Sequence, residues 1–359
     1  MTILNHSRER PKHQQGELRF GILGAAKIAA LALIWPTRLV PGTSVRAVAA
    51  RDVQRAKRFA HKFGIPVVHD SYAELLADPN IDAIYNPLPN SLHCEWTIRA
   101  LQSGKHVLCE KPLAANAQES LRLLQAEQNS QRVLMEAFHY RYHPLATRIK
   151  QIVDSGELGR MQHIEAHLNT NVLNPLDIRF SYELGGGALM DTGSDTVNLI
   201  RFLSGAEPTV VSAHARCIKP NVDRWMEADF QFSDGRTGRI TCSLLSPVIF
   251  RWLVIVQGDR GSMRVVNPIR PYRWHKIVVR HQDGTQRNET VPRDETTFTY
   301  QLRAFAEVVH GQRPNITNAA DAVANLRVID AIYQKAGLDI RGSVDKGLDV
   351  QDSKLARFS

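Results

Sequence analysis

The stretch LRFGILGAAKIAA, residues 18–30, decides the fold, because an apolar strand pattern runs directly into a glycine and then into a helical pattern. Gly24 permits the tight turn that aims the free amides of the next helix at a pyrophosphate. Of the three glycines in the dinucleotide-binding fingerprint only this first one is present, but alanine is small enough to stand at the other two positions. An ordinary strand-turn-helix remains an alternative for this stretch alone.

The rest of the N-terminal part alternates short apolar runs with longer amphipathic ones, a pattern typical of βαβ units. Asn90-Ser91 is expected to cap a helix that ends near Ser103, and residues 54–63 have helical spacing. The expected strands are 18–23, 44–50, 66–69, 82–86, 105–109 and 132–136. This alternation predicts a parallel sheet of the Rossmann type, which supports dinucleotide binding at Gly24.

Beyond about residue 140 strand patterns follow one another with few helices between them. These strands are expected at 161–170, 208–217, 226–232, 237–245 and 250–256, with closing helices at about 296–310 and 318–336. The predicted fold is therefore α/β, with an N-terminal Rossmann domain and a C-terminal α/β domain that has an open, mostly antiparallel sheet. The predicted bounds are 1–17 (flexible arm), 18–140 (Rossmann domain), 141–337 (substrate-binding and oligomerisation domain) and 338–359 (loose tail).

Composition excludes several classes of protein. The 359 residues carry 45 Lys and Arg against 36 Asp and Glu, a net charge of +9, but the basic residues are scattered. Scattered charge argues against a nucleic-acid partner and favours a phosphorylated cofactor. The four cysteines have no zinc or disulfide spacing, so no metal is expected. The longest apolar run, 28–35, is far shorter than the about 20 residues of a membrane span, and residues 1–17 lack a signal-peptide pattern. We therefore expect a cytoplasmic protein that does not bind membranes.

The end of the second strand bears on the choice of cofactor. Arg51 comes first after that strand and Asp52 follows it. In dinucleotide-binding folds an arginine here accommodates the 2′-phosphate of NADP, whereas a carboxylate binds the ribose of NAD. The arginine favours NADP over NAD. The alternative is that Arg51 is only solvated and that Asp52 caps the next helix.

Two further motifs follow strands four and five, Pro89-Asn90 with His93 and Glu110-Lys111-Pro112. Both fall at carboxyl ends of strands, where open α/β sheets bind their ligands. A lone lysine after a strand is usually solvated, but here the two motifs share one edge of the sheet. The predicted cofactor-binding residues are Gly24, Ala26, Lys27, Ile28, Arg51, Pro89, Asn90, His93, Glu110 and Lys111.

With these residues in view, the sequence resembles the glucose-fructose oxidoreductase, inositol dehydrogenase and rhizopine-catabolism (Gfo/Idh/MocA) family over about residues 18–336. The resemblance rests on the motifs above and on three longer stretches, GKHVLCEKP (104–112), FHYRYHP (138–144) and GGGALMDTG (185–193). Within the family, residues 49–52 and 320–333 look most like the NADP-dependent dihydrodiol and pentose dehydrogenase branch.

The resemblance implies a catalytic role for Lys111, which would reach the substrate hydroxyl beside the nicotinamide. It also implies that Lys111-Pro112 can be a cis peptide, that Asp191 lies in the substrate pocket, and that the open sheet is an oligomer face. A homo-oligomer, a dimer or a tetramer, is expected. Next to the cationic nicotinamide of the oxidised complex, the pKa of Lys111 should fall, which would let the lysine relay a proton.

The chain departs from its relatives four residues after Asp191, where the family usually carries a histidine or tyrosine and this chain has Asp195. Residues four apart on a helix share a face, so the two carboxylates should point the same way. Two close, buried carboxylates cannot both ionise easily, so one can serve as a base near neutral pH. The alternative is that Asp195 is a surface carboxylate or that the position has lost its role.

The segment after the sixth strand offers a substitute for the missing proton carrier. His139 is the first choice, because the residues nearest the strand end face the cofactor. Tyr140, Arg141 and His143 are predicted to bind substrate in the same cleft.

These observations predict an NAD(P)-dependent oxidoreductase that transfers a hydride between nicotinamide C4 and a hydroxyl-bearing carbon of a sugar, polyol or cyclic diol. Lys111, Asp191, Asp195 and His139 are the predicted catalytic residues. The alternative is a sensor or regulatory protein that kept the dinucleotide site and lost turnover, because the usual histidine or tyrosine is missing.

Overall fold

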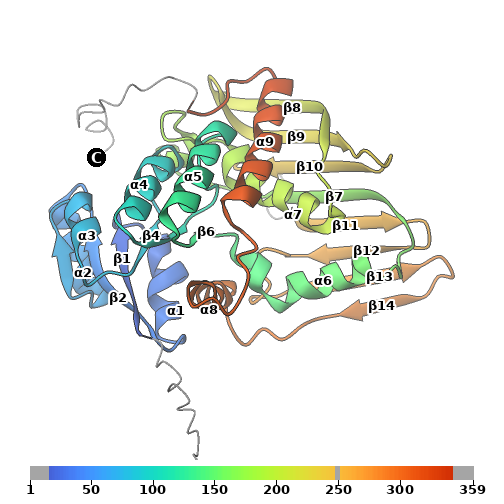
Figure 1. The fold of residues 1–359 in the computed structure, drawn as a ribbon. Helices are drawn as coiled ribbons and strands as arrows, with labels where there is room; N and C mark the ends of the chain where they lie inside the picture. Colours follow the sequence, from blue (N-terminus) through green and yellow to red (C-terminus); the bar gives the residue numbers. More distant parts are fainter. Residues whose placement is uncertain (1–15, 247–250, 343–359) are drawn as a thin grey trace, which may run out of the picture.

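The computed structural model describes residues 16–246 and 251–342, which form two sheets with helices around and between them (Figure 1). Most of the predicted N-terminal arm and C-terminal tail lies outside the described residues. Among the described helices, none is both long and apolar enough to cross a membrane.

The first sheet has six strands in the order β3-β2-β1-β4-β5-β6, and all its pairings are parallel. The strands are β1 (Leu18–Leu23), β2 (Thr43–Ala49), β3 (Val67–His69), β4 (Ala83–Asn86), β5 (His106–Cys109) and β6 (Leu134–Glu136). Every residue of β4 is buried, as expected for a parallel strand covered on both faces. The predicted Rossmann sheet is confirmed. Its strand order reverses between β1 and β4, which is where such sheets bind ligands.

The helices of this domain follow the expected alternation. They are α1 (Trp35–Thr37), α2 (Val53–Phe63), α3 (Tyr72–Ala77), α4 (Asn90–Gln102) and α5 (Ala117–Ser130), with a π-helical turn η1 (Ala30–Ile34) and a 3₁₀ turn η2 (His139–Tyr142). Asp52 caps α2 by accepting a hydrogen bond from Arg55 N at 3.0 Å. The predicted side-chain cap of α4 is wrong, because Asn90 is the first helical residue and its amide donates instead to Gly185 O at 2.9 Å.

The second sheet has eight strands in the order β14-β13-β12-β11-β7-β10-β9-β8. The strands are β7 (Met161–Asn169), β8 (Thr209–Lys219), β9 (Val222–Gln231), β10 (Thr237–Ser243), β11 (Arg251–Gly258), β12 (Gly261–Val266), β13 (Lys276–His281) and β14 (Gln286–Glu289). All pairings are antiparallel except β7 with β10. The mostly antiparallel sheet is therefore confirmed, and β12 to β14 extend it beyond the expected strands.

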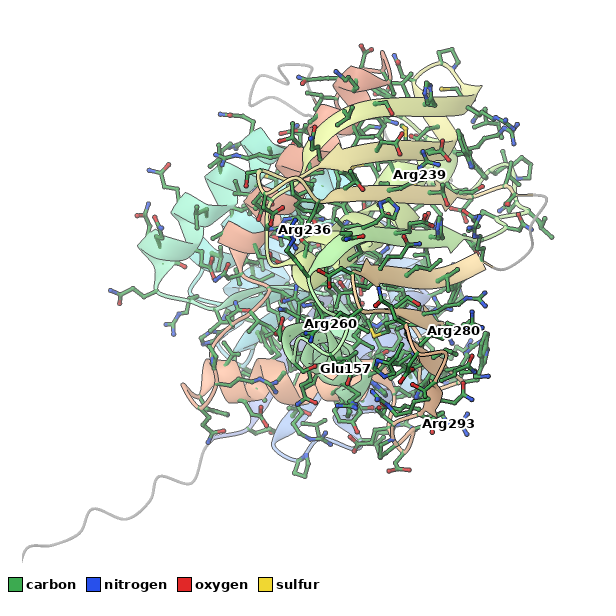
Figure 2. The ribbon with its side chains drawn as sticks, turned by 90° about the vertical axis from the view of Figure 1, so that its right-hand side faces the viewer. Glu157, Arg236, Arg239, Arg260, Arg280 and Arg293 are labelled. Atoms are coloured by element: carbon green, nitrogen blue, oxygen red, sulfur yellow. The ribbon has the colours of Figure 1, made fainter. Side chains whose placement is uncertain are left out.

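One face of this sheet is covered by helices that lie between it and the Rossmann domain (Figure 1). The elements on this side of the molecule are α6 (Pro144–Asp154), η3 (Ile178–Phe180), η4 (Leu189–Gly193), α7 (Ser194–Ser204) and α9 (Ala319–Lys335). Figure 2 looks at the other face, where labelled arginines such as Arg239 and Arg280 are spread across the strands. The sheet is thus open on one side, as predicted.

Helix α8 (Thr297–Val309) leaves the second sheet and packs on the Rossmann domain. Phe305 lies in one apolar cluster with Phe20 of β1, with ring centroids 5.6 Å apart. The domain boundary at residue 140 stays a prediction. Residues of α8, far beyond that boundary in the chain, nevertheless form part of the apolar core of the Rossmann domain.

The described part of the chain extends past Gly337, where the C-terminal tail was expected to begin. Arg341 is fully buried, and its guanidinium pairs with the equally buried Asp223 at 2.9 Å and donates to Gly186 O at 2.7 Å. The prediction of a loose segment directly after Gly337 is therefore wrong for residues 338–342. A buried ion pair with full hydrogen bonding holds this part of the chain.

Candidate active site

The turn expected after β1 is present. Gly24 has φ +84°, and its N–H donates to Ala49 O at 2.7 Å. A side chain here would be strained, and its Cβ would lie 3.1 Å from Leu88 Cδ2. The glycine thus lets β1, β2 and the loop after β4 come together at the switch point of the sheet.

A cleft of about 580 Å³ opens beside this point, lined by both domains. The cleft brings together seven of the predicted site residues: Ile28, Asn90, Glu110, Lys111, His139, Asp191 and Asp195. Residues from the ends of β4, β5 and β6 thus meet the turn that leads into α7, although up to about a hundred positions separate them in the chain. This assembly is the candidate active site.

Lys111 lies where the two domains meet. The Lys111-Pro112 peptide is cis, as the family resemblance implied. The Lys111 ammonium lies 3.0 Å from Asp195 Oδ2 and 3.6 Å from Asp191 Oδ1, and it donates to Asp191 O at 2.5 Å. One cation from the Rossmann domain therefore holds two carboxylates from the second domain.

The pKa values of the two carboxylates are shifted in opposite directions. Burial would raise the pKa of Asp191, but Lys111 and Arg179 outweigh it, and the pKa is lowered. Arg179 Nε donates to Asp191 Oδ2 at 2.8 Å. Asp195 is 4% exposed and forms no ion pair with an arginine among the described residues, so burial raises its pKa although Lys111 opposes the shift. The surroundings of Asp191 therefore favour its charged form, whereas burial of Asp195 favours its neutral form.

This burial overturns one alternative, because Asp195 is not a surface carboxylate. Its place on the helix also differs in detail from expectation. Asp191 lies in the π-helical turn Leu189–Gly193 and Asp195 in the first turn of α7, yet both face the lysine. Such π turns are frequent at functional sites.

The pKa of Lys111 in the protein without cofactor is set by its two carboxylate neighbours. Burial would lower its pKa, but Asp195 and Asp191 outweigh burial, and the pKa is raised. The ammonium is thus retained here. A fall beside a cationic nicotinamide stays a prediction for the oxidised complex.

The segment after β6 is divided between the cleft and the core. His139 lines the cleft, stacks on Phe298 with centroids 4.2 Å apart, and has no hydrogen-bond partner for Nδ1 among the described residues. Burial, helped by Arg270 and Lys111, holds its pKa well below the ordinary value. A neutral imidazole in this place can accept a proton only weakly.

The other three residues of this segment lie outside the cleft lining. Tyr140 donates to Asn198 Oδ1 at 2.6 Å, and Arg141 lies 3.8 Å from Asp321. His143 is fully buried and caps α6 by accepting from Leu145 N. These three residues were expected to line the cleft, but they do not, because their polar groups bind other residues of the protein.

The remaining predicted cofactor residues are not among those that line the cleft. His93 is fully buried, with ring nitrogens 2.8 Å from Pro112 O and 2.7 Å from Leu88 O, so it joins two loops of the site. Pro89 precedes α4, and Ala26 and Lys27 continue the turn after Gly24. Arg51 is exposed at the end of β2. Direct contact of these residues with a cofactor stays a prediction.

Sequence reasoning missed the residues that the second domain adds to the cleft. Arg179 fixes Asp191, while Trp252 of β11, Arg270 of the β12–β13 loop and Phe298 of α8 also line the cleft. No motif marks these residues, and they come from elements whose contact with Lys111 depends on domain packing. Trp252 lies inside the expected strand 250–256 and Phe298 inside the expected helix 296–310, so neither stood out as a site residue.

Comparison with known proteins now defines the class. Residues 18–138 match the model of the oxidoreductase family with an NAD-binding Rossmann fold, and residues 146–264 match that of the GFO/IDH/MocA C-terminal domain. The protein is therefore an oxidoreductase, with a dinucleotide-binding domain and a second domain of matching type. It belongs to the Gfo/Idh/MocA family.

Several relatives share most of this chain. It is 34% identical over 322 residues to a D-xylose 1-dehydrogenase (NADP(+)) of Haloferax volcanii, covering 89% of this chain and 97% of the relative. It is 32% identical over 336 residues to a dTDP-3,4-didehydro-2,6-dideoxy-α-D-glucose 3-reductase of Streptomyces violaceoruber, covering 89% and 96%. A crystal structure of a 3-ketoreductase from Actinomadura kijaniata with NADP and TDP-benzene has a TM-score of 0.81 at 27% identity, covering 89% and 98%.

Proposed function

We propose that this protein uses NADP to interconvert a secondary or anomeric hydroxyl and a carbonyl on a sugar, polyol or cyclic diol. The observation that carries the proposal is the contact of the Lys111 ammonium with Asp191 and Asp195 on the wall of the cleft. The names of the relatives support this substrate class and NADP.

The residues at the carboxyl edge of the first sheet fit a dinucleotide. The Gly24 turn leaves room for a close approach, and Ile28, Leu88 and Asn90 continue from it into the cleft that ends at Lys111. Arg51, exposed at the end of β2, would bind the 2′-phosphate. When bound, the nicotinamide supplies or accepts the hydride.

The chain's own residues handle the proton. Lys111 would donate a hydrogen bond to the reacting oxygen, and Asp195, 3.0 Å away, would take up or return the proton through it. Asp191, held as an anion by Arg179, would keep the ammonium in place. Atoms and charge balance, because the hydroxyl proton ends on the carboxylate while the hydride leaves the carbon.

The direct test is turnover with a panel of aldoses, inositols, amino sugars and dihydrodiols and either NADP or NAD, read at the nicotinamide absorbance. We expect at least one compound to react, faster with NADP. Binding of NADP without turnover of any compound would instead support the sensor function. The family membership and the retained lysine do not favour that alternative.

A homo-oligomer formed through the open face of the second sheet and a cytoplasmic location stay predictions. Size-exclusion chromatography with light scattering measures the first of them.

A further inference from the structure

Between β12 and β13 a short loop carries Arg270 into the cleft. The fold holds this loop tightly. Asn267 is 1% exposed and has φ 54°; its amide group donates to Arg270 O at 2.9 Å and to Trp274 O at 2.7 Å, and its Oδ1 accepts from Arg270 N at 3.1 Å. The backbone of Arg270 is therefore fixed before any ligand binds.

Most charged side chains of the cleft have a charged partner, and Glu110 accepts a hydrogen bond from Tyr85 OH instead. Lys111 faces Asp191 and Asp195, and Arg179 pairs with Asp177 and Asp191. Within residues 16–246 and 251–342, no carboxylate oxygen lies within 4.0 Å of the Arg270 guanidinium.

Within the part of the chain that the structure describes, the Arg270 guanidinium also lies near an aromatic ring. It lies 5.7 Å from the ring centroid of Trp252, whose Nε1 donates to Asn169 O at 3.0 Å. The tryptophan is thus held by the sheet and supports the arginine from one side. The planar, forked donors of Arg270 remain available to a ligand in the cleft.

Arg270 also acts on the reacting groups. Its charge helps to lower the pKa of His139 and partly opposes the rise in the pKa of Asp195. Arg270 and Lys111 line the same cleft, so a substrate whose hydroxyl is at Lys111 can present a second group to Arg270.

We propose that Arg270 is a specificity-determining residue that binds an anionic group of the substrate, a carboxylate or a phosphate, so that the cleft selects acidic sugars over neutral ones. The inference rests on the proposed function, because it concerns the substrate of the same cleft. A charge-assisted, forked contact in a partly desolvated cleft should favour the anionic ligand about 10- to 100-fold.

The experiment measures binding rather than turnover. Calorimetric titrations in the presence of NADP compare D-glucose, D-glucuronate and D-glucose 6-phosphate on the full-length protein. The variants are Arg270→Met, Arg270→Lys and, as a charge-matched control, Arg264→Met, since Arg264 is an exposed arginine on β12. Thermal melting checks that each variant is folded.

We expect an anionic sugar to bind about 10- to 100-fold more tightly than glucose, with the preference lost in Arg270→Met, partly kept in Arg270→Lys and unchanged in Arg264→Met. A preference for glucuronate alone identifies a carboxylate, and one for the phosphate identifies a phosphoryl group. No preference for either anion, whether all three compounds bind equally or none binds, overturns the proposal.

Two further outcomes keep the assignments apart. A loss of NADP affinity in Arg270→Met would mean that Arg270 serves the cofactor, and this also overturns the proposal. An Arg270-dependent anion preference in a protein that turns over no compound of the panel would leave the subsite standing while the proposed oxidoreductase function fails.

Discussion

The two walls of the cleft are built differently. On the Rossmann side, Asn90, Glu110 and Lys111 follow directly from strand ends, so their place is set by local sequence. On the other side, Asp191 follows a turn that is held by the distant, buried Asp223, and Arg270 lies in a loop that the buried Asn267 holds. The first wall supplies Lys111, and the second supplies the two carboxylates that set its charge environment.

The largest effect is expected at the point where the walls meet. Lys111→Met removes the ammonium that contacts both Asp191 and Asp195, and should lower kcat about 10²- to 10⁴-fold while NADP affinity changes little. Steady-state kinetics and a cofactor titration measure the two quantities. A variant that keeps more than about a tenth of the activity is incompatible with this role.

The second wall should be the one that global stability depends on. Arg341→Met leaves the buried Asp223 without its cationic partner. Asp223 also accepts a hydrogen bond at 2.7 Å from the N–H of Leu189, in the turn that contains Asp191. At Gly187, φ is +130° and a Cβ would lie 2.2 Å from Asp223 Oδ1, so the whole turn is packed around this pair. Loss of about 3–5 kcal/mol of unfolding free energy is expected in urea denaturation.

The matched control for that measurement is an exposed pair in the same sheet. Arg239→Met breaks the ion pair with Asp229, in which the Arg239 side chain is 44% exposed and that of Asp229 is 35% exposed. This substitution should lower the free energy of unfolding by only about 0–1 kcal/mol. Equal losses in the two variants would mean that the Arg341–Asp223 pair does not anchor the second wall.

This asymmetry explains what could be predicted from the sequence. Strand alternation and the Gly24 turn predicted the first sheet and the place of Lys111, because periodicity and turn chemistry act over a few residues. Tyr140 and Arg141 were expected in the cleft because they follow β6, but a 3₁₀ turn directs them into the core. Arg179 and Arg270 were missed, because only the packing of the two domains brings them to Lys111.

A smaller effect separates the two carboxylates of the second wall. Asp195→Asn keeps the shape but removes the titrating group, and should lower kcat about 100-fold. Because the pKa of Asp195 is raised, oxidation by the parent should increase as pH rises through the apparent pKa of the pair, and reduction should decrease. The variant should lose this limb in pH-rate profiles.

Asp191→Asn is the matched variant, since the pKa of Asp191 is lowered and its carboxylate stays charged across that range. It should weaken the placement of Lys111 yet keep the pH limb. If Asp195→Asn is nearly fully active while His139→Ala is inactive, the proton passes through the segment after β6 instead.

The smallest effect is expected at the outer end of the first wall. Arg51 is exposed where β2 ends, and one charge-assisted contact to a 2′-phosphate in that setting is worth about tenfold in affinity. Arg51→Ala should therefore weaken NADP binding and spare NAD. Arg58→Ala controls for lost charge, because Arg58 is exposed on α2 and lies 3.8 Å from Asp52. Fluorescence titration of each variant with NADP and with NAD measures the two affinities. If Arg51→Ala weakens the binding of both cofactors equally, or of neither, another residue of this wall selects the cofactor.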